Sequence, residues 1–158
     1  MRMSLLAGLG LLLAALTLLP AGPAAAQGVF AGTWQVVDAQ PAPWVDGTAA
    51  TQPDYDKALT HAKITFRKDR LDAPSLLGCR KARYALSKVE PESLFQGGLT
   101  DPAKQAAALG FKGTEITSLN FGCASGSADI EMDFALADHD TAFFALNNVL
   151  YKMSRKKP

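Results

Sequence analysis

The chain of 158 residues contains few of the side chains that catalyse reactions or hold metal ions. Its only histidines are His61 and His139, and it has none of the HExxH, GxSxG, Walker or dinucleotide-binding motifs. His139 lies between Asp138 and Asp140, but adjacent residues seldom supply three ligands to one metal, so we interpret this run as an exposed turn. The sequence therefore favours a protein that is not an enzyme and holds no metal or other cofactor.

An excess of charge of either sign is also absent. The chain has 16 Lys and Arg against 15 Asp and Glu, and Arg2 is the one charged residue among the first 26. The rest of the chain is therefore neutral, with 15 basic and 15 acidic side chains. Domains that bind nucleic acid carry a basic face, so we expect no nucleic-acid partner.

The first 26 residues have the three-part pattern of a secretory signal peptide. Arg2 precedes an apolar run at 5–19, Pro20 interrupts it, and Ala26 ends a run of small residues. The run of about 15 residues is shorter than the roughly 20 that a membrane-spanning helix needs. We therefore predict cleavage after Ala26, a location in the periplasm or outside the cell, no stable membrane anchor, and a single domain at 27–158.

Cysteine is rare, with Cys79 and Cys123 alone. Neither belongs to a CxxC pair or has a histidine nearby. An exported chain meets an oxidising compartment, where an even number of cysteines favours pairing. We predict a disulfide between the two, and two free thiols or a metal-binding pair are the alternatives.

Alternating apolar and polar residues predict short antiparallel strands. The clearest case is 128–136, where Met132 and Phe134 fall on one face and Glu131 and Asp133 on the other. Further strands are predicted at 33–39, 63–67, 70–76, 83–87, near Leu119, at 142–146 and at 149–153. Asn147 and Asn148 tolerate positive φ and predict a tight hairpin turn between the last two strands.

One helix is predicted after Asp101, which could cap it. Pro102 suits its first position, and Gly110 ends it. About eight short strands and one short helix indicate a mainly β fold. We predict a small antiparallel up-and-down barrel, which encloses side chains or one small ligand.

The segment Gly32-Thr33-Trp34 resembles the start of the first strand in calycins, the group of lipocalins, fatty-acid-binding proteins and avidin-type proteins. In those barrels the tryptophan closes one end and often packs against an arginine of the last strand. The resemblance implies that Gly32, Trp34 and Arg155 close the barrel here, with the guanidinium over the indole face.

Two further resemblances are to exported domains. Gly78-Cys79, Tyr84 and Cys123 resemble the middle of META-type domains, although Arg80 stands where those domains usually carry Asn. The early Gly-x-Trp and single disulfide are also similar to small periplasmic barrels that inhibit lysozyme or metalloproteases.

Two functions fit such a barrel. The first is binding of a small, partly apolar molecule inside it, lined by Phe66, Tyr84, Met132 and Phe134, with Tyr84 as the polar group. The second is a protein-facing role, as an inhibitor of an exported lysozyme or protease or as an envelope accessory protein. Its contact surface would be the loop that carries Trp44, Val45 and Pro53.

Overall fold

A computed structural model describes residues 28–46, 55–74, 77–124 and 129–157 of the chain. The predicted signal peptide at 1–26 lies outside these ranges, as does Pro53. Within the described ranges, no helix has the length and apolar character to cross a membrane.

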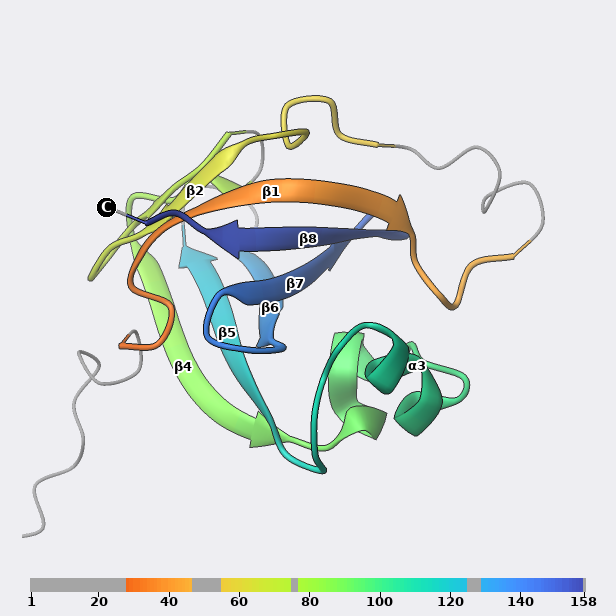
Figure 1. Cartoon of the computed structure of the whole chain (residues 1–158). Helices are drawn as coiled ribbons and strands as arrows, with labels where there is room; N and C mark the ends of the chain where they lie inside the picture. Colours follow the sequence, from red (N-terminus) through yellow and green to blue (C-terminus); the bar gives the residue numbers. More distant parts are fainter. Residues whose placement is uncertain (1–27, 47–54, 75–76, 125–128, 158) are drawn as a thin grey trace, which may run out of the picture.

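Eight antiparallel strands form one curled, nearly closed sheet (Figure 1). They are β1 (Gly32–Pro41), β2 (Lys63–Phe66), β3 (Leu71–Asp72), β4 (Ala82–Val89), β5 (Ile116–Ala124), β6 (Asp129–Leu136), β7 (Thr141–Leu146) and β8 (Val149–Arg155). Their order in the sheet is β3-β2-β1-β8-β7-β6-β5-β4, so the first strand pairs with the last and every other neighbour is consecutive in the chain. The predicted mainly β, up-and-down barrel is confirmed. The strand predicted at 70–76 is shorter than expected, and β1 extends further.

Two short helices, both between β4 and β5, are present in the described ranges. The predicted helix is α3 (Pro102–Ala108), and a 3-10 helix, η2 (Pro91–Gly97), precedes it. Asp101 does not cap α3 with its side chain; instead its backbone NH donates to Gln105 Oε1. At the other end Gly110 adopts φ 93°, and the NH groups of Gly110 and Phe111 donate to Ala107 and Ala106. This Schellman geometry ends the helix and turns Phe111 toward the barrel.

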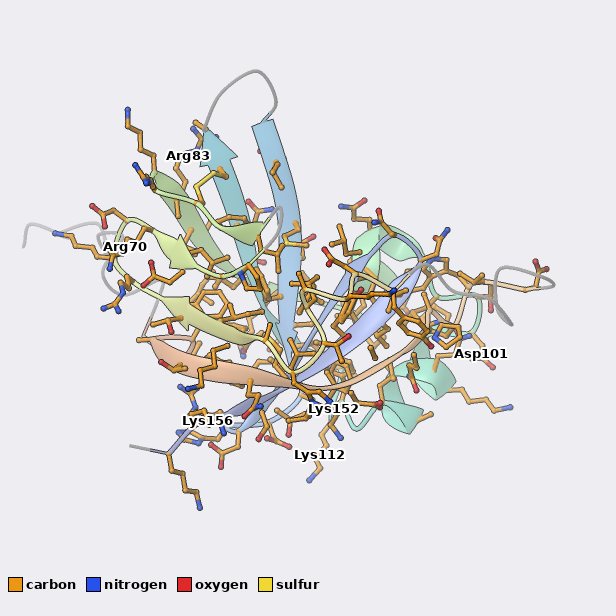
Figure 2. All side chains as sticks on the ribbon, turned by 90° about the horizontal axis from the view of Figure 1, so that it is seen from above. Arg70, Arg83, Asp101, Lys112, Lys152 and Lys156 are labelled. Atoms are coloured by element: carbon orange, nitrogen blue, oxygen red, sulfur yellow. A yellow bond between two sulfur atoms is a disulfide. The ribbon has the colours of Figure 1, made fainter. Side chains whose placement is uncertain are left out.

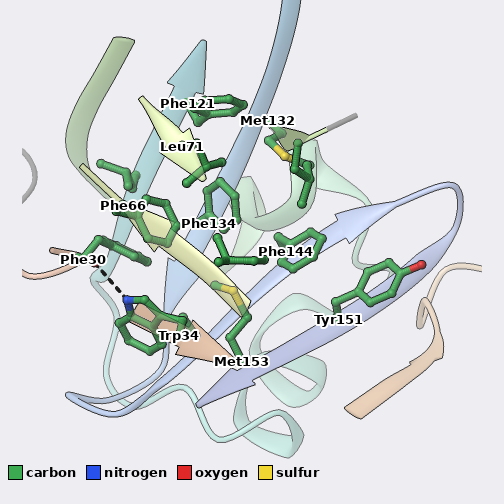
Figure 3. Close-up of a cluster of buried hydrophobic side chains, with 14 of the residues drawn as sticks. Phe30, Trp34, Phe66, Leu71, Phe121, Met132, Phe134, Phe144, Tyr151 and Met153 are labelled. Atoms are coloured by element: carbon green, nitrogen blue, oxygen red, sulfur yellow. Dashed lines mark hydrogen bonds between the residues drawn. The ribbon is translucent and has the colours of Figure 1, made fainter. Parts of the chain in front are cut away.

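The barrel interior is packed with aromatic side chains (Figure 3). The ring centroids of Phe66 and Phe134 are 5.0 Å apart, those of Phe134 and Phe144 are 5.3 Å apart, and Phe144 stacks on Tyr151 at 4.9 Å. All four side chains are buried, as the alternation of apolar residues along the strands requires.

A second apolar cluster lies outside the barrel wall, and the sequence did not predict it. Ala135, Phe143 and Leu150 point outward from β6, β7 and β8, and the side chains of η2 and α3 cover them. The cluster also contains Leu94, Phe95, Leu99, Ala106, Phe111 and Ile116. The middle of β7 is therefore buried on both faces, which explains its unbroken apolar sequence.

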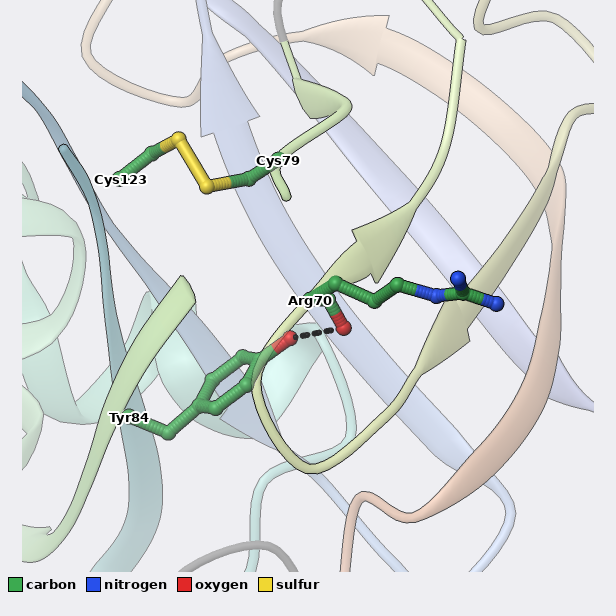
Figure 4. Close-up of a disulfide and its surroundings, with 4 residues drawn as sticks. All are labelled: Arg70, Cys79, Tyr84 and Cys123. Atoms are coloured by element: carbon green, nitrogen blue, oxygen red, sulfur yellow. Dashed lines mark hydrogen bonds between the residues drawn. A yellow bond between two sulfur atoms is a disulfide. The ribbon is translucent and has the colours of Figure 1, made fainter. Parts of the chain in front are cut away.

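The barrel closes between β3 and β4 through a few contacts (Figure 4). Leu71 and Cys79 form a two-hydrogen-bond bridge, and the backbone NH of Ala82 donates to Asp69. Across the same seam the Tyr84 hydroxyl donates to the backbone oxygen of Arg70 at 2.9 Å. The predicted disulfide joins Cys79 to Cys123 of β5.

Candidate functional site

Three of the four residues predicted to line a ligand cavity belong to the aromatic packing of the barrel interior. Phe66, Tyr84 and Phe134 pack against other aromatic rings, with Phe66 to Tyr84 centroids 6.1 Å apart. Side chains thus fill this part of the barrel. Met132 differs, because it lies at the edge of the core and lines a cleft that opens to the surface.

This cleft lies where β6 and β7 separate. Their pairing ends at Phe134 and Phe144, although β6 continues back to Asp129 and β7 continues forward to Leu146. Figure 2 shows the β5–β6 pair diverging from the β7–β8 pair. The cleft has a volume of about 450 Å³, within the range of small-ligand sites. Its lining comprises Trp44, Leu77, Phe95, Gln96, Gly98, Ile130, Glu131, Met132, Asp133, Ala145, Leu146, Asn147 and Asn148.

The floor of the cleft is apolar and its outer rim is polar. Leu77 and Met132 are buried members of the barrel core, and Ile130 and Leu146 pack against that core. Glu131 is exposed, and the Asp133 carboxylate accepts a hydrogen bond from Asn120 Nδ2 at 3.1 Å. The rim therefore carries two acidic side chains, and no lysine or arginine lines the cleft in the described part of the chain.

Two aromatic rings from different segments form one wall. Trp44, which follows β1, packs on Phe95 of η2 with ring centroids 5.7 Å apart. The indole NH of Trp44 donates to Asn148 Oδ1 at 3.3 Å. These contacts fix the half-buried indole at the cleft and tie it to the turn between β7 and β8.

Backbone strain is concentrated at this cleft. Among the described residues, five other than glycine have positive φ, and four of them line the cleft: Phe95 (51°), Gln96 (60°), Asn147 (51°) and Asn148 (61°). The two asparagines form the predicted hairpin turn, which requires this conformation. Phe95 and Gln96 have no such local preference, and each costs of order 1–3 kcal/mol. Strain of this kind is commonly found at binding sites.

The main chain of β6, which forms one wall of the cleft, presents hydrogen-bonding groups. Ala137 donates its NH to Thr141 of β7, and Ala135 pairs with Phe143. Backbone groups of alternate residues face the same neighbour, so those of Glu131 and Asp133 also point toward β7. The register places Asp133 opposite Ala145 and would place Glu131 opposite Asn147. The last pair of the ladder, Phe134 with Phe144, uses the Asp133 C=O as acceptor for the Ala145 NH, so the NH of Asp133 and both backbone groups of Glu131 lie beyond the ladder.

The residues predicted to close the barrel come together at its other end. Trp34 is fully buried, and its indole NH donates to the Phe30 backbone oxygen at 2.9 Å (Figure 3). The Arg155 guanidinium lies 4.2 Å from the centre of the Trp34 ring. Gly32 has φ 105°, a conformation that favours glycine. This end is filled by the protein's own groups.

Tyr84 and Asp138 have shifted pKa values that are explained by structural roles. Burial, followed by the nearby carboxylates of Asp72 and Asp69, raises the pKa of Tyr84 above its usual value of 10.0. A hydrogen bond from the backbone NH of Asp140 lowers the pKa of Asp138 in the turn predicted from the sequence. Among the described residues, no three His, Cys, Asp or Glu side chains are arranged to hold a metal ion.

Comparison with known proteins adds no family assignment. The chain matches no family model, and no curated protein and no solved structure is significantly similar to it. The nearly closed eight-stranded barrel is consistent with a calycin-like fold.

Proposed function

We propose that this protein is an exported binding protein that holds a partly apolar ligand in the cleft between β6 and β7. The observation that carries the proposal is the cleft itself, in which an apolar floor at Leu77 and Met132 meets the aromatic wall of Trp44 and Phe95. Apolar lining with a few polar groups is typical of small-ligand sites. Export is supported by the signal-like first 26 residues and by the disulfide, which is compatible with an oxidising compartment.

The test is a titration with N-phenyl-1-naphthylamine, an uncharged apolar dye whose emission rises in apolar surroundings. We expect the dye to bind the wild-type protein and expect Leu146→Glu to weaken binding at least tenfold, because the new carboxylate enters the apolar floor. Val37→Glu is the matched control, since Val37 is exposed and does not line the cleft. Equal loss in both variants, or in neither, contradicts the proposal.

A milder variant provides a second test in case Leu146→Glu does not fold. Asn148→Gly removes the acceptor of the Trp44 indole NH and keeps the positive φ of the turn. We expect a several-fold weaker dye affinity and a thermal unfolding midpoint close to wild type. Unchanged dye affinity in this variant and in a folded Leu146→Glu would place the dye elsewhere.

A further inference from the structure

We infer that the natural ligand of the cleft is an extended peptide segment that pairs as an added strand with the free edge of β6. This inference rests on the proposed function, because it names the chemical class of the ligand for the same cleft.

The first argument is the pattern of backbone groups. The NH and C=O groups of Glu131 and the NH of Asp133 face the cleft beyond the end of the β6–β7 ladder, two residues apart on an extended strand. That spacing is about 6.8 Å, the repeat with which an extended main chain presents its own donors and acceptors. A compact apolar molecule could occupy the floor but could not satisfy these three groups. An added strand satisfies them, as it does in other complexes that extend a sheet.

The second argument is the alternation of side chains along β6. Met132 and Ile130 point to the apolar floor, while Glu131 and Asp133 carry their carboxylates on the opposite face. A strand laid beside β6 must alternate in the same way, and cross-strand neighbours favour opposite charges. The fitting peptide therefore alternates apolar residues, which face Leu77 and Leu146, with basic residues, which face the two carboxylates.

The same charges disfavour a second copy of this chain as the occupant. Antiparallel pairing of two β6 edges would bring the carboxylates of Glu131 and Asp133 of both copies together. Like charges on facing strands are destabilising, and charged side chains are a common protection of free strand edges. The charges on this edge therefore favour pairing with a basic strand and disfavour pairing with β6 of a second copy.

The experiment uses acetylated and amidated Lys-Val-Lys-Val-Lys as the probe, with the full exported chain and detection by fluorescence anisotropy. Two derivatives carry N-methyl groups on alternate residues, one set on each edge of the extended peptide. We expect one set to weaken binding at least tenfold and the other less than twofold, since only one edge faces β6. Equal effects of the two sets, whether large or small, overturn strand pairing.

Two protein variants test the charge argument. Glu131→Lys is expected to weaken peptide binding at least tenfold. Glu115→Lys, a matched change at an exposed acid outside the cleft, is expected to leave it within twofold. Equal affinities of the two variants overturn the assignment of a basic peptide.

Amide hydrogen exchange gives a readout at the proposed edge. Bound peptide should slow exchange at Glu131 and Asp133 at least tenfold, while Ile130 and Met132, whose backbone groups face β5, change little. Unchanged exchange at Glu131 and Asp133 with bound peptide contradicts the inference. Dye binding that is lost in Leu146→Glu but is not displaced by peptide would overturn the peptide inference alone. Insensitivity of both probes to Leu146→Glu would overturn the proposed function as well.

Discussion

Arg155, the last residue of β8, stacks its guanidinium on Trp34 of β1 and donates hydrogen bonds to the backbone oxygens of Ala31 at 2.9 Å and His139 at 3.0 Å. It also bonds the backbone oxygen of Val29. One side chain therefore holds together the segment before β1, the first strand and the turn between β6 and β7.

We expect Arg155→Ala to lower the free energy of unfolding by about 2–4 kcal/mol, because a cation–π contact and several charge-assisted hydrogen bonds are lost. Arg155→Lys should recover only part of this loss, since lysine cannot keep the planar, multiply donating contact. Chemical denaturation measures both. Lys152→Ala, at an exposed lysine of the same strand, should change stability by less than about 0.5 kcal/mol. An Arg155→Ala variant as stable as Lys152→Ala would show that the barrel end closes without the arginine.

The disulfide joins residues 44 positions apart, and in the chain-entropy model a loop of that length contributes about 4 kcal/mol. We expect the double variant Cys79→Ser, Cys123→Ser to lose about 2–4 kcal/mol of unfolding free energy. Wild-type protein unfolded in the presence of a reductant should show a similar loss. An unfolding free energy that neither treatment changes would mean that the hydrogen bonds between β3 and β4 keep the barrel closed without the disulfide.

Tyr84 makes stability depend on alkaline pH. Because burial raises the pKa of Tyr84, the unfolded chain releases this proton first as pH rises above the usual 10.0. The contribution of Tyr84 is thus fully present below pH 10.0 and is lost as pH rises through the higher folded-state pKa. Tyr84→Phe should lack this alkaline loss and, at neutral pH, be destabilised by about 1 kcal/mol through the missing hydrogen bond to Arg70.

The control for this measurement is Tyr55→Phe, at a tyrosine that is 38% exposed. It should retain the alkaline loss of the wild-type protein in denaturation curves between pH 8 and 11. If the unfolding free energy of Tyr84→Phe falls with alkaline pH as steeply as that of Tyr55→Phe, groups other than Tyr84 cause the pH dependence.

Gly98 supports the aromatic wall of the cleft. A Cβ added there would lie 3.0 Å from two ring atoms of Trp44, closer than side chains normally pack. We expect Gly98→Ala to displace the indole, shift its fluorescence emission and weaken dye binding several-fold. The Gly98 φ of −70° suits alanine, and the added Cβ would also lie 3.2 Å from the backbone oxygen of Phe95.

Gly122→Ala provides the matched comparison. The nearest atom to an added Cβ there is 3.5 Å away, in the Arg83 side chain, which is an ordinary contact. This variant should bind dye as the wild-type protein does. Equal dye affinity in both alanine variants would mean that Trp44 does not form part of the binding surface.

Local sequence patterns predicted the barrel because the signals needed for it lie within a few residues. Alternation at 128–136 marks one buried face, and the pair Asn147-Asn148 marks the turn between β7 and β8. The pairing of Cys79 with Cys123 followed from their number and the predicted export.

The cleft was not predictable in the same way, because it arises from strand registers. β6 has regular alternation along its length, and nothing local shows that its pairing with β7 ends at Phe134. The left-handed Phe95 and Gln96 also oppose local preference and depend on the outer cluster around Phe143. The one local signal was the unbroken apolar run of β7, because strands that are buried on both faces lack the alternation of apolar and polar residues.

The strand order has a consequence for how the molecule is assembled. In the sheet, β8 is the only described strand that joins the β1–β3 group to the β4–β7 group through a ladder. Because β8 is the last strand of the chain, no ladder can join the β1–β3 group to the β4–β7 group until Val149–Arg155 is present. Completion of the sheet is therefore a late event. Shortening the chain within β8 should leave the two groups connected by the β3–β4 seam and the disulfide but not by a ladder, with uncovered apolar faces that promote aggregation.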